Sequence, residues 1–318
     1  MKTGKILLVI ISVFFIVPLP VFFHASGGPS DKAAPDDAKG REFIIWAHSD
    51  IQPQNMKERD HYRIAALDIK ENIRPVNAAI VAGDIVQYAE SDEDFRWILE
   101  TRGIASVPYW YEIAGNHDER NIANYFKYMK KPLYYTVAAG NLLIILLSDE
   151  VNSSPSEISD HAFHWWEKWV MENQDKTIIT VTHAQLPESG LMFSSIYRSK
   201  VLGSERFTEV LKKYRVDLWL SGHTTSPAID SFNDNSVKEL NNTLFINISS
   251  IRREPGMSVR SRIIYLSENS DEMIIKFRDH DKKKFIDGNE RRIKLRAPFS
   301  GRGGTPKIYY PGGTIIPE

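Results

Sequence analysis

Short apolar runs alternate with longer amphipathic segments over most of the chain, and polar clusters directly follow five of the apolar runs. The runs that predict strands cover residues 43–47, 79–82, 109–113, 142–147, 178–182 and 218–220. The helix predictions cover residues 61–72, 92–101, 161–173 and 204–214. Continuously apolar strands separated by helices are typical of a sheet with helices on its faces. The alternation therefore predicts an α/β layered fold with a mainly parallel or mixed sheet.

The C-terminal part of the chain has a different pattern. Three apolar runs, residues 244–248, 261–266 and 272–277, follow one another without intervening helices, which indicates a C-terminal antiparallel strand segment. Residues 301–318 contain five glycines and three prolines. This composition predicts an extended tail after a domain that spans residues 41–300.

The N-terminal segment has the composition of a targeting signal. Lys2 and Lys5 precede an apolar run over residues 6–17, and a basic start followed by a short apolar run is typical of a secretory signal peptide. We therefore predict that residues 1–27 are a signal peptide or, if uncleaved, an N-terminal anchor that tethers the protein to a membrane. Residues 28–40 are predicted to be a flexible linker. The expected location is periplasmic or extracellular.

Charge and cysteine content exclude several classes of protein. Lys and Arg total 40 against 41 for Asp and Glu, so no overall positive field exists to hold nucleic acid. We expect no nucleic-acid partner except as a substrate, and the sequence carries no signal for an oligomeric state. The chain has no cysteine, which excludes disulfides, a thiol nucleophile and a thiolate metal site. Any metal must be held by imidazole, carboxylate or amide side chains.

Five polar clusters stand at the carboxyl ends of predicted strands, where ligands collect in open α/β sheets. In chain order they are Ser49-Asp50-Ile51-Gln52, Gly83-Asp84, Gly115-Asn116-His117-Asp118, His183 and Gly222-His223. Each cluster taken singly has a plainer explanation, since a Gly-Asp pair is usually only a turn. Their common position after strands indicates one site that combines carboxylate, amide and imidazole groups.

These clusters resemble the sequence blocks of the calcineurin-like metallophosphoesterase superfamily, which are Asp-x-His, Gly-Asp, Gly-Asn-His-Asp/Glu, a lone His and Gly-His-x-His. The resemblance runs from about residue 43 to His223 and beyond. It implies a two-sheet α/β sandwich with two divalent metal ions (manganese, magnesium, zinc or iron) at the strand ends. Two such ions roughly 4 Å apart can clamp a phosphoryl group and lower the pKa of water, so that hydroxide forms near neutral pH. Together with the N-terminal signal, the resemblance implies hydrolysis of a phosphomonoester or phosphodiester, small or polymeric, outside the cytoplasm.

The resemblance implies a complete second metal site. Asp84 would bridge the two ions, because only a carboxylate supplies a negative oxygen to each cation at once. Asn116, His183 and His223 would complete the set, which suits manganese, zinc or iron. These four residue types are all present in the expected blocks.

The residues that follow Asn116 would supply the proton. His117 matches the family's proposed acid, which protonates the leaving oxygen, and a His pKa near neutrality suits that task. Asp118 would orient the His117 ring. Substrate specificity would come from loops around the site, and we expect residues 187–201 and 226–242 to form them.

The first metal site departs from the family pattern. Gln52 stands where the family has a His after Asp50, and Thr225 replaces the last His of Gly-His-x-His. Asp50, Gln52, Asp84 and waters would then form an oxygen-only site that favours magnesium, manganese or calcium over iron or zinc. The same departure supports an alternative hypothesis, a non-catalytic phosphate- or metal-binding protein that kept the fold while its first site degenerated.

Three other features have both a functional and a structural explanation. His48 could replace a lost ligand, although a buried, hydrogen-bonded His is the simpler prediction. Arg252 and Arg253 follow a strand close to the predicted site, where they could hold substrate phosphate or lie on the surface. The run Asp279-His280-Asp281 combines acidic and imidazole groups, and its place after a predicted strand indicates a charged turn.

Overall fold

The computed structural model describes residues 42–73, 75–148, 155–225, 234–253, 256–312 and 315–317. The predicted signal segment and linker, residues 1–40, lie outside the described residues, as do residues 226–233 of the second predicted specificity loop. In the described part of the chain, no helix has the length and apolar character needed to cross a membrane.

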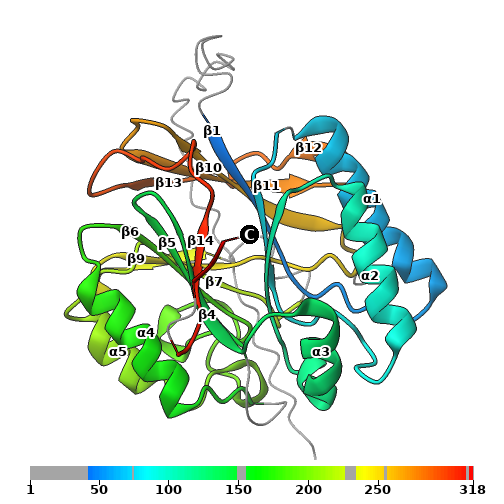
Figure 1. Cartoon of the computed structure of the whole chain (residues 1–318), viewed down its shortest axis with the longest axis horizontal. Coiled ribbons are helices and arrows are strands. Elements are labelled where there is room, and N and C mark those ends of the chain that lie inside the picture. The colour runs from blue at the N-terminus through cyan, green and yellow to red at the C-terminus, as the bar shows by residue number, and fades with distance from the viewer. Residues whose placement is uncertain are drawn as a thin grey trace, which may run out of the picture.

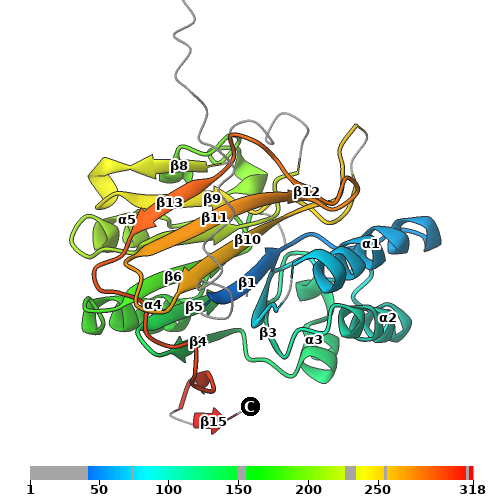
Figure 2. The same ribbon diagram turned by 90° about the horizontal axis from the view of Figure 1, so that it is seen from above.

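The described residues form two sheets that pack against each other through a shared apolar core (Figures 1 and 2). The first sheet has the order β12-β11-β10-β1-β2-β3, with β13 also paired to β11. Its strands are β1 (Glu42–His48), β2 (Ala78–Ala82), β3 (Tyr109–Ile113), β10 (Arg260–Ser267), β11 (Glu272–Asp279), β12 (Lys284–Phe285) and β13 (Arg291–Lys294).

The second sheet has the order β15-β14-β4-β5-β6-β7-β9-β8. Its strands are β4 (Tyr134–Ala139), β5 (Leu142–Leu147), β6 (Thr177–Thr182), β7 (Leu218–Ser221), β8 (Asp234–Val237), β9 (Thr243–Asn247), β14 (Lys307–Tyr309) and β15 (Ile315–Pro317). Strands β5, β6, β7 and β9 run parallel, as do β1, β2 and β3 of the first sheet. The carboxyl ends of β5, β6, β7 and β9 therefore lie at one edge of the second sheet.

Helices cover the outer face of each sheet (Figure 1). The first sheet packs against α1 (Met56–Asn72), α2 (Asp92–Ile104) and α3 (Ile122–Met129), and the second against α4 (Asp160–Glu172) and α5 (Glu205–Leu211). The predicted α/β sandwich is confirmed. The predicted C-terminal antiparallel segment is also present, because β10 pairs antiparallel to both β1 and β11.

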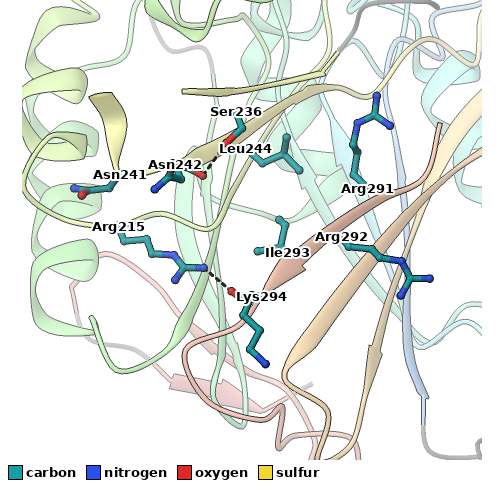
Figure 3. Close-up of a pocket in the computed structure, with 9 residues that line it drawn as sticks. All are labelled: Arg215, Ser236, Asn241, Asn242, Leu244, Arg291, Arg292, Ile293 and Lys294. Atoms are coloured by element: carbon teal, nitrogen blue, oxygen red, sulfur yellow. Dashed lines mark hydrogen bonds between the residues drawn. The ribbon is translucent and has the colours of Figure 1, made fainter. Parts of the chain in front are cut away.

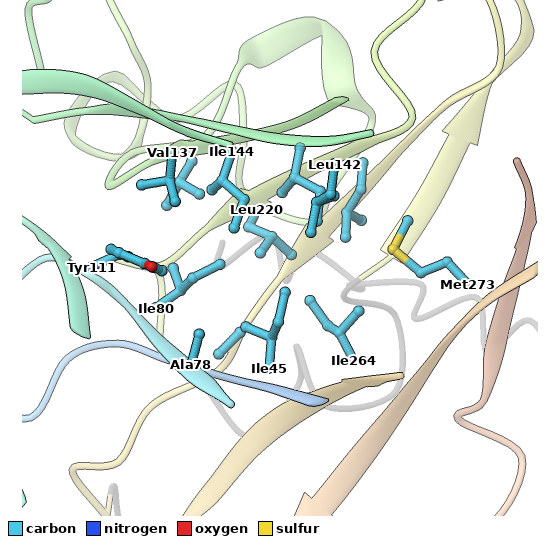
Figure 4. Close-up of a cluster of buried hydrophobic side chains, with 14 of the residues drawn as sticks. Ile45, Ala78, Ile80, Tyr111, Val137, Leu142, Ile144, Leu220, Ile264 and Met273 are labelled. Carbon is cyan, nitrogen blue, oxygen red and sulfur yellow. The ribbon is translucent and has the colours of Figure 1, made fainter. Parts of the chain in front are cut away.

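The shared core explains why the central strands are apolar on both faces (Figure 4). Ile45 of β1 and Ile80 of β2 meet Ile144 and Leu220 of the second sheet in one buried cluster. The intervening residue Trp46 points to the opposite face and packs under the helices. Because successive side chains alternate between faces, a strand covered on both sides reads as a continuous apolar run.

One helix begins earlier than predicted, and one helix was not predicted. Helix α1 begins at Met56, earlier than the predicted residue 61, because the Asn55 side chain caps it by accepting the N–H groups of Lys57 and Glu58 at 3.1 Å. Helix α3 was not predicted. It is short, and it ends at Lys130, which adopts a left-handed conformation with φ 56°.

The segment predicted as a tail contributes to the second sheet. Strand β14 pairs antiparallel with β4, so the sheet extends past the predicted domain end at residue 300. Asn141 anchors this return of the chain: its backbone N–H donates to the Ser300 carbonyl at 2.9 Å, and its side-chain oxygen accepts the Ser300 N–H at 2.8 Å. The glycines and prolines of this segment therefore flank a short edge strand.

A buried polar cluster lies behind the first sheet. Asp68 accepts two hydrogen bonds from the Arg278 guanidinium, at 2.7 and 2.8 Å, and lies 2.8 Å from Nδ1 of His280. His280 Nε2 in turn lies 2.7 Å from the Ser261 hydroxyl. A turn over residues 280–283 follows β11, which ends at Asp279, but His280 is fully buried rather than solvated. Ionic pairing of Asp68 outweighs the effect of its burial and lowers its pKa.

His48 is buried beside this cluster without the hydrogen bond that we expected. Its ring stacks on Trp46, with ring centroids 3.9 Å apart, and neither ring nitrogen has a hydrogen-bond partner among the described residues. Burial, with a smaller contribution from His280, lowers the pKa of His48 to about 3. His48 faces the helices and is a packing residue, and the structure does not make it a metal ligand.

We expect His48→Phe to reduce the loss of stability in mild acid. The folded pKa of about 3 lies below the unfolded value of about 6.5, so the unfolded state binds more protons and stability is lost as the pH falls from about 6.5 towards 3. Between pH 7.5 and pH 5 this group alone removes about 2 kcal/mol of unfolding free energy. Phe keeps the stacking on Trp46 but cannot titrate.

Urea unfolding at the two pH values measures this difference. The wild type should lose about 2 kcal/mol more than the variant between pH 7.5 and pH 5. Equal losses would show that His48 does not titrate as its burial requires.

Candidate metal centre

The sandwich brings the polar clusters of both sheets to one edge. Asp50, Asp84 and Asn116 follow β1, β2 and β3 of the first sheet, while His183 and His223 follow β6 and β7 of the second. Backbone hydrogen bonds hold neighbouring loops together, from Asp50 N–H to the Gly83 carbonyl at 3.1 Å and from Gly222 N–H to the His183 carbonyl at 2.9 Å. The five predicted clusters therefore form one site.

Three of the predicted ligands have donor atoms grouped tightly enough for a metal ion. One atom from each of Asp84, His183 and His223 lies within 4.8 Å of the others. Nε2 of His183 is central: it lies 3.3 Å from Oδ1 of Asp84, 3.1 Å from Nδ1 of His223 and 3.1 Å from Oδ1 of Asn116. The structure thus brings together the side chains predicted for the second metal site, and the cluster of Asp84, His183 and His223 is a candidate metal site.

Backbone carbonyls set the protonation of the two imidazole rings. His183 Nδ1 lies 2.7 Å from the Ala82 carbonyl, and His223 Nε2 lies 2.8 Å from the Arg198 carbonyl. Each of these nitrogens must carry a proton, because a carbonyl can only accept. His183 Nε2 and His223 Nδ1 then face each other at 3.1 Å, and Oδ1 of Asp84 lies 3.3 Å from the same His183 nitrogen. A metal ion fits this donor set, with the carbonyls orienting the rings.

Burial and the charges of neighbouring groups set the pKa values of these ligands. Burial, followed by the charge of His183, lowers the pKa of His223 to about 4. Burial alone would raise the pKa of Asp84, but the charge and hydrogen bond of His183 outweigh it and hold the pKa at about 2. Asp84 is therefore an anion at neutral pH, as a metal ligand must be.

Asp50 and Gln52 form an oxygen-lined half of the site. Oδ2 of Asp50 accepts from the Ser49 hydroxyl at 2.6 Å and the His223 N–H at 2.9 Å. Its Oδ1 and the Oε1 of Gln52 are buried with no hydrogen-bond partner among the described residues. Burial raises the pKa of Asp50 to about 7. Buried oxygens without donors are of the type that a hard cation binds, so the oxygen-only site stays a prediction.

Several of these residues have strained backbones. Asp50, Asp84 and His223 adopt left-handed conformations with φ of 51°, 53° and 65°, which cost free energy and tend to occur at functional sites. Glycine is required directly before the ligands Asn116 and His223, because carboxylate oxygens of other ligands approach the backbone closely there. A Cβ on Gly115 would lie 2.5 Å from Oδ1 of Asp84, and one on Gly222 would lie 2.8 Å from Oδ2 of Asp50.

A family model described as calcineurin-like phosphoesterase matches residues 43–227. The chain belongs to this family. Its members depend on metal ions to hydrolyse phosphoesters, and the cluster of Asp84, His183 and His223 is a candidate metal site in this member. The family resemblance that the sequence indicated is confirmed.

Solved structures support the fold of this family member. It resembles a purple acid phosphatase from yellow lupin seeds with a TM-score of 0.59 and 11% identity, covering 80% of this chain and 54% of that one. It also resembles GAP50, the anchor in the inner membrane complex of Plasmodium, with a TM-score of 0.58 and 15% identity, covering 80% of this chain and 89% of that one. The chain thus spans about half the length of the lupin enzyme. No curated protein sequence matches it.

His117 lies at the mouth of the site, and Asp118 does not contact its ring. His117 Nδ1 lies 3.3 Å from the Gln87 carbonyl, and its Nε2 lies 4.0 Å from Oδ2 of Asp84. The Asp118 carboxylate instead accepts the backbone N–H groups of Ile85, Val86 and Gly115 at 2.9–3.1 Å. The expected orienting role of Asp118 is therefore corrected: it holds the loops that carry Asp84 and Asn116. Burial raises its pKa to about 7 and lowers that of His117.

The sequence analysis missed the groups that position the ligands. Ser49 hydrogen-bonds both Asp50 and the Ser249 carbonyl, and the Asn247 amide donates to the carbonyls of Gly222 and Thr224 at 3.1 Å. Ser49 adjoins a ligand in sequence and could have been inferred. The carbonyls of Ala82 and Arg198 carry no sequence signal, because every residue has one.

A cavity lined by Arg215, Arg291 and Lys294 is remote from the metal centre (Figure 3). Its volume is about 590 Å³, and it lies where the second sheet's β7 and β9 begin, opposite the ends that carry the ligands. Its basic groups are already paired: Arg291 binds Asp234 at 2.6 Å, and Arg215 binds the Lys294 carbonyl at 2.7 Å. We do not place the active site there.

We expect manganese to stabilise the chain through these ligands. Binding to the folded state alone raises the unfolding free energy by about 2.7 kcal/mol at an ion concentration 100 times the Kd. Asp84→Asn and His223→Ala should abolish most of the rise in Tm, because each removes a donor at the centre of the set. His164→Ala is the matched control, since His164 is an exposed histidine of α4.

Thermal unfolding of the metal-stripped proteins, with and without manganese, measures the effect. A rise in Tm that is the same in Asp84→Asn as in the wild type would place the metal elsewhere.

Proposed function

We propose that this family member hydrolyses a phosphomonoester or phosphodiester outside the cytoplasm, with two divalent metal ions at the edge shared by its sheets. The observation that carries the proposal is the cluster of donor atoms from Asp84, His183 and His223, which all lie within 4.8 Å of one another. The basic and apolar N-terminal segment supports a location in the periplasm or outside the cell, and a membrane tether if it is not cleaved. The substrate is a small or polymeric phosphoester.

The residues divide into two groups around Asp84. His183, His223 and Asn116 offer nitrogen and amide donors on one side, and Asp50 and Gln52 offer oxygens on the other. When bound, divalent ions supply positive charge to a phosphoryl group and acidify water. The oxygen-only half favours manganese or magnesium.

His117 is placed to complete the reaction. Its Nδ1–H donates to the Gln87 carbonyl, which fixes the ring, and its Nε2 faces the site. The side chain is 16% exposed, so a leaving group at the mouth can reach it. In its protonated form, Nε2–H would give its proton to the departing oxygen, which contributes a factor of about 10² to 10⁴ to the rate in enzymes of many kinds.

One specific observation favours a non-catalytic alternative. The first half of the site has Gln52 and Thr225 where imidazoles are usual in the family, so a protein that only binds a metal or phosphate would also fit. The strained conformations of Asp50 and Asp84 argue against decay, because such strain persists only where the surrounding structure enforces it.

Turnover of an aryl phosphate monoester and diester, measured with manganese or magnesium restored to the metal-stripped chain, tests the proposal. We expect activity only with added metal, a loss of at least about 10³-fold in Asp84→Asn, and a loss of about 10²-fold in His117→Ala.

The outcomes separate the two hypotheses. If no phosphoester is hydrolysed while manganese still raises the Tm, the chain is a binding protein. If the metal-stripped and metal-restored proteins have equal rates, metal dependence is wrong.

A further inference from the structure

A second cavity, of about 570 Å³, has a basic lining. Its walls come from the start of α1 and from the loop that follows β9. The lining includes the cationic side chains of Lys57, Arg252 and Arg253 and the ring of His61, against one carboxylate, that of Glu58. The cavity is therefore positive where the chain as a whole is neutral.

The acidic groups at the cavity are already engaged. The Glu58 carboxylate accepts the Gln54 N–H at 2.9 Å and the Asn55 amide at 2.9 Å, as part of the cap of α1. Asp281 pairs with Arg253 and also accepts the Val259 N–H at 2.9 Å. Lys57 is exposed, and its ammonium makes no hydrogen bond or ion pair with any residue of the described ranges.

His61 offers a fixed hydrogen-bond donor to this cavity. The residue is only 8% exposed, and its Nδ1 accepts the Arg253 N–H at 3.2 Å. The proton of the neutral ring must therefore be on Nε2. No group in the described part of the chain accepts that proton. Nε2 is not among the buried polar atoms that lack a partner, so it opens to the cavity and can donate to an anion there.

The loop that lines this cavity is hydrogen-bonded to the backbone of Asp50, a predicted metal ligand. The Arg252 N–H donates to the Asp50 carbonyl at 2.9 Å, and the Ser250 hydroxyl donates to the same oxygen at 3.1 Å. The Gln54 amide, oriented so that its oxygen faces Arg252, accepts from both terminal nitrogens of that guanidinium at 3.1 and 3.2 Å. Arg252 is thus held between the oxygen-lined half of the site and the cavity.

We propose that this cavity is a subsite for a second anionic group of the substrate, a phosphate or a carboxylate. The inference rests on the proposed function, because it assumes that the first phosphoryl group binds at the metal centre. Guanidinium groups bind such anions through two parallel hydrogen bonds, and charge-assisted bonds are about twice as strong as neutral ones. The substrate class is therefore a phosphoester that carries a further negative charge on the part that is not hydrolysed.

Matched substrate pairs test this inference in the metal-loaded protein. Fructose 1,6-bisphosphate is compared with fructose 6-phosphate, and 3-phosphoglycerate with glycerol 3-phosphate, so that the second group is a phosphate or a carboxylate. In the wild type, kcat/KM should be at least about tenfold higher for the substrate with the second anion. The pair with the larger ratio identifies the preferred group.

Lys57→Gln and Arg253→Gln should each reduce that ratio by about five- to tenfold, and the double variant should bring it close to one. Lys168→Gln is the matched control, because Lys168 is an exposed lysine on α4. It should leave the ratio unchanged. A ratio near one in the wild type, or ratios in Lys57→Gln and Arg253→Gln equal to that of the control, would overturn the subsite.

Binding of inorganic phosphate to the metal-stripped chain separates this inference from the proposed function. Calorimetry should detect binding to the wild type and to Lys168→Gln, and a loss of at least about tenfold in affinity in the Lys57→Gln, Arg253→Gln double variant. If no phosphoester is hydrolysed but this difference is seen, the anion subsite stands and the hydrolase proposal fails. If phosphate binds all variants equally, the subsite is wrong whatever the activity.

Discussion

The contact between Asp84 and His183 joins the two sheets of the sandwich at the point where the chemistry is expected. Asp84 follows β2 of the first sheet and His183 follows β6 of the second, and their side chains lie 3.3 Å apart. Packed sheets are separated by about 10 Å, so the loops after the strands must turn inward to make such a contact. The shared apolar core holds both sheets in the register that allows it.

The inward turn of these loops accounts for most of the unusual backbone in the site. Asp50, Asp84 and His223 are left-handed, and the glycines that precede ligands leave room for carboxylates that approach the backbone closely. Buried carboxylates then serve two purposes. Asp84 faces the ligands, while Asp118 binds three backbone N–H groups and keeps the loops in place. The strain is distributed over a network of hydrogen bonds that a single substitution can disturb.

The site is chemically asymmetric, and the charge around it follows that asymmetry. On the side of His183 and His223, the carbonyls orient ring nitrogens, and imidazole ligands favour ions such as zinc or iron. On the side of Asp50 and Gln52, buried oxygens favour a harder ion, and the basic cavity around Arg252 begins there. A substrate with a second anionic group would complement this distribution, since both the metal centre and the cavity attract negative charge.

Much of this could be predicted from the sequence, because it depends on local patterns. Apolar runs of strand length predicted the fold class. Polar clusters after five of these runs identified Asp50, Asp84, Asn116, His183 and His223 as candidate ligands. Tertiary structure alone decided what those residues touch. Asp118 adjoins His117 in sequence but binds the backbone of the neighbouring loops. His48 lies on the face of β1 that the helices cover, because side chains alternate between the faces of a strand. Strand β14 comes from a segment rich in glycine and proline and pairs with β4. The physical reason is that hydrogen-bond partners far apart in the chain, including the carbonyls of Ala82 and Arg198, meet only when the two sheets pack.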